Sequence, residues 1–246
     1  MQTFYFTDPG KVRSHNEDSV AIINNDRNEF ILIVADGMGG HKAGEVASAI
    51  ATEHIRESFY SLETLGTKEE AIDWMRLIVK EINDKIFEYA DKNPESKGLG
   101  TTLVLAIKTN DYILYGNIGD SSGYVIKNNT LHKVTKDHTY VSMLINNGRL
   151  TEESAKNHPG KNLLTRALGA NNPIEIDIFD IDTSVKGLFL CSDGLTNMVS
   201  DEQIEKILCS NLPIEEVVVK LIKKANARGG TDNISIAYLK KESGDD

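Results

Sequence analysis

The chain has 246 residues, of which 40% are hydrophobic, and 27 basic against 37 acidic side chains give a net charge of −10. This composition supports a large core and excludes wholesale disorder. The acidic excess disfavours nucleic acid, whose phosphates require a positive face. No apolar run approaches the ~20 residues of a membrane span, and no secretory signal is recognisable. Two cysteines are too few for a disulfide framework, so we expect a cytoplasmic protein that does not insert into a membrane.

The first part of the chain predicts strands followed by two helices. The apolar run 20–23 follows Asp18, and the run 30–35 ends at Asp36 and is typical of a strand buried on both faces. Apolar residues at helical spacing then predict a helix over 43–59. Thr67 and Glu70 have the spacing of a capping box, which predicts a second helix that runs to about residue 91, before Pro94.

The remainder predicts mainly strands, over 101–107, 112–118, 123–126, 131–134, 174–181, 187–191 and 233–239. Asn128-Asn129 suits a tight hairpin turn. The polar segment 137–165 is expected to be a surface excursion with a short helix over 140–146. Ser200 and Gln203 predict a capping box for another helix, and 214–227 predicts the last one. We expect antiparallel sheets with helices outside, in a single domain over 1–241, and a polar tail over 242–246.

Acidic residues stand at the ends of these strands, next to glycine in most cases. Each of Asp18, Asp36, Asp120, Asp193 and Asp232 could by itself be a turn residue. Together they would gather at one edge of a sandwich and repel one another unless cations neutralised them. A site made of carboxylate oxygens selects Mg²⁺ or Mn²⁺.

A basic residue precedes the first of these carboxylates. Arg13 lies five positions before Asp18, and a planar guanidinium can bind two phosphate oxygens. An arginine exposed on the surface is the alternative interpretation of Arg13.

Several ordered motifs resemble the metal-dependent Ser/Thr protein phosphatases (type 2C, PPM family), in particular the bacterial stand-alone branch. The resemblance implies a mixed α/β (α+β) fold, a four-layer αββα sandwich of two mainly antiparallel sheets flanked by helix pairs. It also implies a flap at about 137–165 beside a metal site. The motifs are the segments 13–18, 34–41, 100–102, 119–121, 192–195 and 230–233.

The resemblance also assigns roles to individual residues. Asp36 is similar to the carboxylate that bridges two cations, with the Gly37 carbonyl beside it, and Asp193 and Asp232 are similar to the other direct ligands. Asp18 and Glu17 resemble groups that act through water, Asp120 resembles a ligand of a third, weaker cation, and Arg13 resembles a phosphate clamp.

The family activity is hydrolysis of phosphoserine and phosphothreonine in proteins by direct attack of a water that bridges two Mn²⁺ or Mg²⁺ ions. The expected partners are phosphorylated proteins, namely a bacterial Ser/Thr kinase and its substrates, and the expected state is a monomer.

The general acid and two alternative functions stay open at this point. Met38 stands where eukaryotic members have histidine, so the nearby His41, which could equally be structural, and a metal-bound water are both candidate acids. Residues 119–123 match the G-x-S-x-G pattern of serine hydrolases, with Ser121 as nucleophile, but a strand rather than a helix is predicted to follow. A catalytically inactive phosphoprotein-binding module would be expected to lack metal ligands, whereas Asp36, Asp193 and Asp232 are all present.

Overall fold

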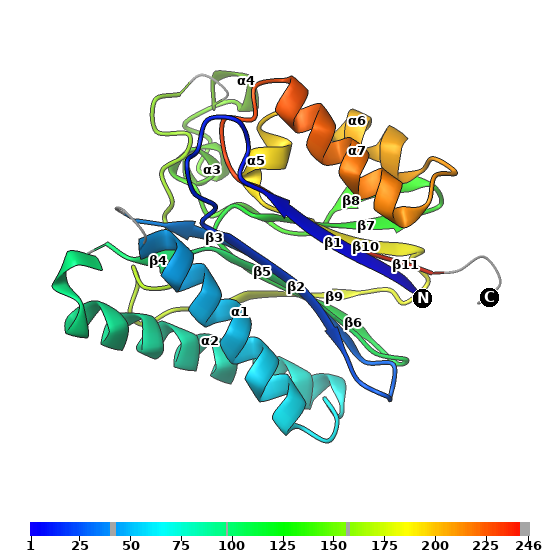
Figure 1. Ribbon diagram of the computed structural model, residues 1–246, viewed down its shortest axis with the longest axis horizontal. Coiled ribbons are helices and arrows are strands. Elements are labelled where there is room, and N and C mark those ends of the chain that lie inside the picture. The colour runs from blue at the N-terminus through cyan, green and yellow to red at the C-terminus, as the bar shows by residue number, and fades with distance from the viewer. Residues whose placement is uncertain (40–42, 97, 156–157, 242–246) are drawn as a thin grey trace.

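The computed structural model describes residues 1–39, 43–96, 98–155 and 158–241. Two antiparallel sheets stack face to face, and helices cover the outer face of each (Figure 1). The αββα sandwich that the family resemblance implied is confirmed. No helix within these described ranges has both the length and the apolar character that a membrane span requires. His41 and the tail 242–246 lie outside the described residues.

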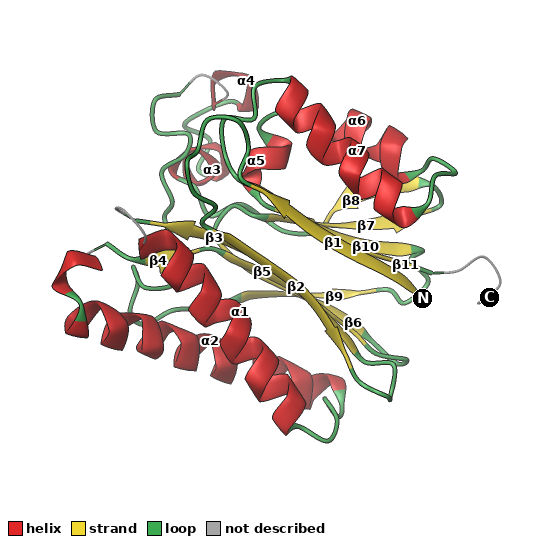
Figure 2. Cartoon of the chain, viewed as in Figure 1, coloured by secondary structure: helices red, strands yellow, loops and turns green. Residues whose placement is uncertain are grey.

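The first sheet joins the N-terminal strand to the last strand of the chain. All of its strand pairs are antiparallel. In spatial order it contains β1 (Gln2–Asp8), β11 (Ile234–Lys240), β10 (Gly187–Cys191), β7 (Ser122–Lys127) and β8 (Thr130–Lys133). Its outer face is covered by α6 (Asp201–Leu208) and α7 (Ile214–Ala227), while the single turn α5 (Asp193–Thr196) follows directly after β10 (Figure 2).

The second sheet is built from strands that are close together in the sequence, with one late addition. In spatial order it contains β2 (Asp18–Asn24), β3 (Phe30–Met38), β5 (Leu103–Lys108), β6 (Ile113–Ile118) and β9 (Asp177–Ile181), with β4 (Gly100–Thr101) paired to the end of β3. The long helices α1 (Ala43–Ser61) and α2 (Lys68–Lys92) cover its outer face, and the short 3-10 turn η1 (Pro94–Ser96) follows. The short helices α3 (Tyr140–Asn146) and α4 (Glu152–Ala155) lie in the polar excursion.

The core has three apolar clusters, one in each space between adjacent layers of the four-layer sandwich. One cluster fills the space between α1, α2 and the second sheet, and another packs α6 and α7 on the first sheet. Between the two sheets lies a third cluster, which includes Leu32, Tyr115 and Leu190. Because both faces of β3 are covered, its run 30–35 is apolar throughout, as the sequence predicted.

The helices, strands and turns predicted from local sequence signals were confirmed in most cases, and three of these predictions were wrong. The capping box of Thr67 and Glu70 is formed, and Asn128 and Asn129 both have positive φ, as a tight hairpin turn requires. Ser200 is the N-cap of α6, but its side chain makes no capping hydrogen bond, so the predicted capping box there is wrong. The strand predicted over 174–181 begins only at Asp177.

The third error concerns the strand predicted over 101–107, which is divided into β4 and β5. It is interrupted at Thr102, whose backbone N–H donates to the carbonyl of Asp36 at 2.9 Å instead of continuing a regular ladder.

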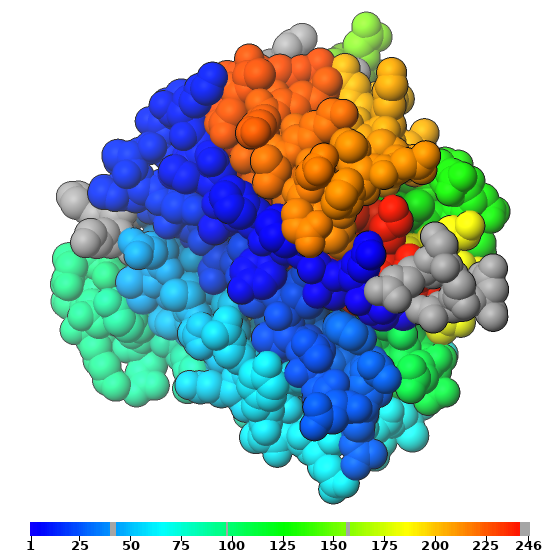
Figure 3. All heavy atoms as spheres, turned by 45° about the vertical axis from the view of Figure 1, so that its right-hand side comes forward, coloured from blue at the N-terminus to red at the C-terminus, as the bar shows by residue number. Residues whose placement is uncertain are grey.

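The N-terminal segment forms a dark-blue strip on one face of the molecule, beside the orange surface of α7 (Figure 3). The sequence analysis identified no strand before Asp18, yet β1 pairs along its whole length with β11, from Gln2↔Lys240 to Asp8↔Ile234. This pairing brings the loop that carries Arg13 beside the turn that carries Asp232. The strand ends of both sheets thereby meet at one end of the sandwich.

Candidate metal centre

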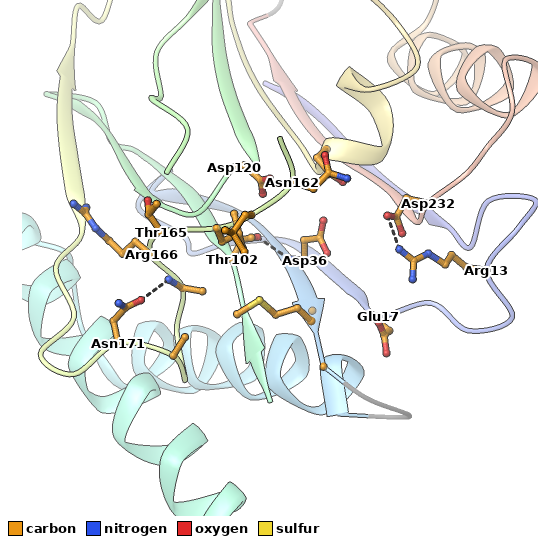
Figure 4. A pocket seen from close by; sticks show the side chains of 18 residues that line it. Arg13, Glu17, Asp36, Thr102, Asp120, Asn162, Thr165, Arg166, Asn171 and Asp232 are labelled. Atoms are coloured by element: carbon orange, nitrogen blue, oxygen red, sulfur yellow. Dashed lines mark hydrogen bonds and ion pairs between the residues drawn. The ribbon is translucent and has the colours of Figure 1, made fainter. Parts of the chain in front are cut away.

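A pocket of about 480 Å³ opens at this end of the sandwich (Figure 4). Both the carboxylates and the segment 162–167 line it. Each carboxylate lies within two residues of the start or end of a regular element. The lining acidic residues are Glu17 before β2, Asp36 in β3, Asp120 between β6 and β7, Asp193 at the start of α5, and Asp232 before β11.

Asp18 lies directly behind the carboxylates that line the pocket. It starts β2 and pairs with Asp36 of β3 across the ladder. Its side chain is only 9% exposed, and one carboxylate oxygen accepts a hydrogen bond from the Ser192 hydroxyl at 2.8 Å. The carboxyl of Asp18 is thus close to the others but separated from the open pocket.

The electrostatics of the cluster follow from burial and from repulsion between like charges. Burial raises the pKa of Asp18 to about 7, and the charges of Asp193 and Asp232 add to that shift. Burial likewise raises the pKa of Asp120 to about 7, with a further contribution from Asp193. The pKa of Asp36 lies well above its ordinary value because of burial and then the charge of Asp18. These carboxylates therefore occupy a place where the protein alone does not stabilise their ionised forms.

This chemistry fits divalent cations. Oδ1 of Asp18 and Oδ1 of Asp193 are buried without a hydrogen-bond partner among the described residues, and such an oxygen is costly unless something positive or a donor meets it. Burial and the charge of Asp232 raise the pKa of Asp193, while the hydrogen bond from Asn197 opposes that rise. In the described part of the chain, no three His, Cys, Asp or Glu side chains form a group that could hold an ion by themselves. Mg²⁺ in proteins usually keeps several waters and takes only one or two carboxylates.

The backbone beside Asp36 is fixed by close approach. A Cβ on Gly37 would lie 2.1 Å from the carbonyl oxygen of Gly44 and 2.5 Å from that of Glu17, so only glycine fits there. The Gly37 N–H donates to the Glu17 carbonyl at 3.1 Å. Burial raises the pKa of the Glu17 carboxyl, and the charge of Arg13 opposes that rise. Glu17 and Gly37 thus stand together at the edge of the pocket.

Arg13 is at the pocket, but it is already paired. One guanidinium nitrogen donates to Oδ2 of Asp232 at 2.8 Å, across 219 positions of sequence (Figure 4). The hydrogen bond and the charge of Asp232 raise the pKa of Arg13. The side chains are 51% and 33% exposed, respectively. The family resemblance implied that Arg13 is a phosphate clamp, and the structure adds a contact between Arg13 and a predicted metal ligand.

Thr102 is a supporting residue that the sequence analysis quoted only as part of a motif. Its hydroxyl accepts from the Asp36 N–H at 3.0 Å and lies 2.8 Å from the hydroxyl of Ser121. It therefore joins the strand of Asp36 to the turn of Asp120. A pair of threonines after a glycine is too common in sequences to reveal such a link.

The same contact argues against Ser121 as a nucleophile. Ser121 is fully buried and its hydroxyl faces Thr102. The turn leads into strand β7 rather than into a helix, so the strand–turn–helix geometry of a nucleophile elbow is not present here.

The fold and the pocket together define a class of protein: a four-layer αββα sandwich with an acidic pocket and an arginine at its edge. The comparisons with known proteins agree. The family Protein phosphatase 2C matches residues 11–234. The chain is 42% identical to the "Serine/threonine phosphatase stp" of Listeria welshimeri, over 98% of this chain and 96% of that protein. It is 36% identical to "Protein phosphatase PhpP" of Streptococcus pneumoniae, over 97% of each chain.

A solved structure gives the same result. The S. agalactiae serine/threonine phosphatase superposes with a TM-score of 0.93 at 34% identity, covering 98% of this chain and 99% of that one. The chain belongs to the protein phosphatase 2C family, whose members depend on Mn²⁺ or Mg²⁺.

Proposed function

We propose that this chain removes phosphate from phosphoserine and phosphothreonine in proteins, using divalent cations held at the acidic pocket. The observation that supports this most strongly is the set of buried carboxylates with raised pKa values that faces one pocket beside Arg13. The relatives are named Ser/Thr phosphatases, and the similarity covers nearly their whole length.

We assign the cation ligands as follows. Asp36, the Gly37 carbonyl, Asp193 and Asp232 would hold a pair of Mn²⁺ or Mg²⁺ ions, and Asp120 would hold a third, weaker ion. Asp18 and Glu17 would act through water. When bound, such cations lower the pKa of water so that it can attack phosphorus, and they neutralise the negative charge of the phosphate.

The residues of the chain itself then bind and orient the substrate. Arg13 uses one nitrogen for Asp232, and the rest of its guanidinium would bind phosphate oxygens by charge-assisted hydrogen bonds. Its contact to Asp232 holds the guanidinium next to the cation site, so that one phosphate could meet both. Met38 lines the pocket and cannot donate a proton, and the leaving-group acid therefore stays unassigned.

The segment 162–167, which lines the pocket together with the carboxylates, would face the substrate protein. Leu163 and Asn162 line the pocket, and Leu163 is 60% exposed. An apolar side chain held open at the edge of the pocket is suited to contact with a polypeptide rather than with a small phosphate ester alone. We propose that the excursion over 137–165 is this substrate-facing flap.

The experiment is a phosphatase assay on a phosphothreonine peptide, with Mn²⁺ added and then chelated. Activity that requires Mn²⁺ supports the proposal. Activity that persists in chelator and is blocked by a serine-directed acylating reagent would instead favour a serine hydrolase. Phosphopeptide binding without turnover at saturating Mn²⁺ would identify a binding module. Asp193→Asn is the matched negative control, since it removes one charge and keeps the size of the side chain.

The domain organisation, oligomeric state, compartment and partners of the chain are part of the same proposal. We propose one catalytic domain over residues 1–241 that acts as a monomer in the cytoplasm and opposes a Ser/Thr kinase and that kinase's substrates. Cys191 and Cys209 are both free thiols, one buried and one exposed, which suits a reducing compartment.

A further inference from the structure

A largely buried histidine connects the turn of Asp120 to the segment 162–167 of the pocket lining. The side chain of His138 is 10% exposed. The backbone N–H of Gly119 donates to its Nδ1 at 3.1 Å, and the backbone N–H of His138 donates to the Gly119 carbonyl at 2.9 Å. Both polar backbone groups of the residue before Asp120 are therefore bound to His138.

These contacts define the tautomer of the ring. A backbone N–H can only donate, so Nδ1 is the unprotonated acceptor and the proton of the neutral ring is on Nε2. Nε2 lies 3.2 Å from Oδ2 of Asp177. The other oxygen of Asp177 accepts from the Arg166 guanidinium at 2.6 Å, and Arg166 lines the pocket. A continuous row of hydrogen bonds thus runs from Gly119 through His138 and Asp177 to Arg166.

His138 also stands where the ends of the polar excursion meet. Its carbonyl accepts from the Thr165 N–H at 2.8 Å, and the Tyr140 N–H donates to the Leu163 carbonyl at 2.8 Å. These bonds tie the start of the excursion to its end, directly beside the Asp120 turn.

The turn of Asp120 needs such an anchor for a physical reason. Gly119 has φ +100°. Glycine populates positive and negative φ about equally, so the residue itself does not hold the turn in this conformation. Asp120 would hold its cation with few other charged ligands, so the binding depends on where that one carboxylate points. Groups that orient a ligand typically change metal affinity or activity by roughly ten- to a hundredfold.

We propose that His138 is a positioning residue that sets the Gly119–Asp120 turn for cation binding, with Asp177 and Arg166 holding its imidazole in the required tautomer. This inference rests on the proposed role of Asp120 in binding a third cation.

The test is His138→Ala, with Mn²⁺ binding followed by calorimetry and phosphatase activity followed against Mn²⁺ concentration. We expect weak-site binding to fall roughly ten- to a hundredfold, while tight binding and the unfolding midpoint change little. His158→Ala is the matched control, because the Nδ1 of His158 also accepts from a backbone N–H, that of Gly160 at 3.0 Å, but within the excursion itself. The control should keep the weak site.

Two further variants separate positioning from general structure. His138→Asn keeps an acceptor for the Gly119 N–H and should recover most of the lost affinity. Asp120→Ala/His138→Ala should behave like Asp120→Ala alone within about twofold, since both changes act on one carboxylate. If His138→Ala does not fold, Asp177→Asn is used instead. This variant should also lower Mn²⁺ affinity at the weak site, by a smaller factor than His138→Ala.

Two results would overturn the inference. In the first, the losses of Mn²⁺ affinity caused by the two substitutions multiply in the double variant; in the second, His138→Ala binds Mn²⁺ at the weak site with unchanged affinity. An inactive wild-type enzyme would refute the proposed function separately, because Mn²⁺ calorimetry does not require turnover.

Discussion

Removing divalent cations should make the stability of this protein fall as the pH rises. The carboxylates of the pocket are buried together, and burial raises the pKa of Asp18 from 3.8 to about 7. The folded, metal-free protein therefore keeps a proton that the unfolded chain releases. This stabilisation is complete below the ordinary pKa and is lost as the pH rises through about 7.

The size of the effect follows from the two pKa values. For Asp18 alone, the free energy of unfolding should drop by roughly 2.5 kcal/mol between about pH 5 and about pH 8. The pKa of Asp120 is also raised to about 7 by burial, but these groups titrate together, so their contributions do not simply add. The buried imidazole of His138, whose pKa is lowered by burial, acts in the opposite direction towards pH 5. A change of roughly 2.5 kcal/mol corresponds to about 5–10 °C in Tm for a domain of this size.

The assay is urea unfolding in chelator at several pH values, followed by the fluorescence of Trp74, the single tryptophan. Trp74 donates to the Ser58 hydroxyl at 2.9 Å on the helical layer and so reports unfolding of the core away from the pocket. Saturating Mn²⁺ should restore stability at pH 8, because a ligand at about 100 times its Kd adds roughly 2.7 kcal/mol. Asp18→Asn keeps the side-chain size and should flatten the pH dependence of the metal-free protein.

A metal-free protein whose stability is constant, or rises, between pH 5 and pH 8 would refute this reasoning. It would mean that the carboxylates are well solvated or lie apart when no cation is bound. An Asp18→Asn variant with the same slope as the wild type would assign the effect to other groups.

Three further predictions concern Asp193, Arg13 and Asp120 of the pocket, with the buried Ser121 as a control. Asp193→Asn should lose Mn²⁺ affinity and turnover, yet keep or increase the stability of the metal-free protein, which calorimetry and thermal unfolding would measure; near-native binding and turnover would contradict its role as a ligand. Arg13→Ala should lower kcat/KM for a phosphopeptide roughly ten- to a hundredfold, mainly through KM, since a charge-assisted contact is worth about 1.5–3 kcal/mol; an unchanged kcat/KM would exclude the clamp. Asp120→Ala should abolish the rise of activity at millimolar Mn²⁺ and keep about two tightly bound ions. Ser121→Ala should stay active and lose about 1 kcal/mol of stability, because its hydrogen bond to Thr102 is lost. An inactive Ser121→Ala beside an active Asp120→Ala would favour a serine nucleophile.

Local signals in the sequence determined most of the regular elements. Thr67 and Glu70 lie three positions apart, and one turn of helix brings them into contact whatever the rest of the fold does. The paired asparagines 128 and 129 adopt positive φ for an equally local reason. The motif at Ser200 failed because the spacing of a capping box permits the hydrogen bond but does not require the side chain to make it.

The carboxylates of the pocket were also recognisable in the sequence, since each one ends or starts an element whose apolar pattern is clear. Their ligand roles remain predictions. What the sequence could not supply are the contacts between distant segments. Arg13 meets Asp232 only because β1 pairs with β11, and Asp177 reaches His138 only because β9 pairs with β6. Strand pairing of this kind depends on how whole sheets pack, so the contacts that position the site are decided by the tertiary structure and not by the spacing of residues along the chain.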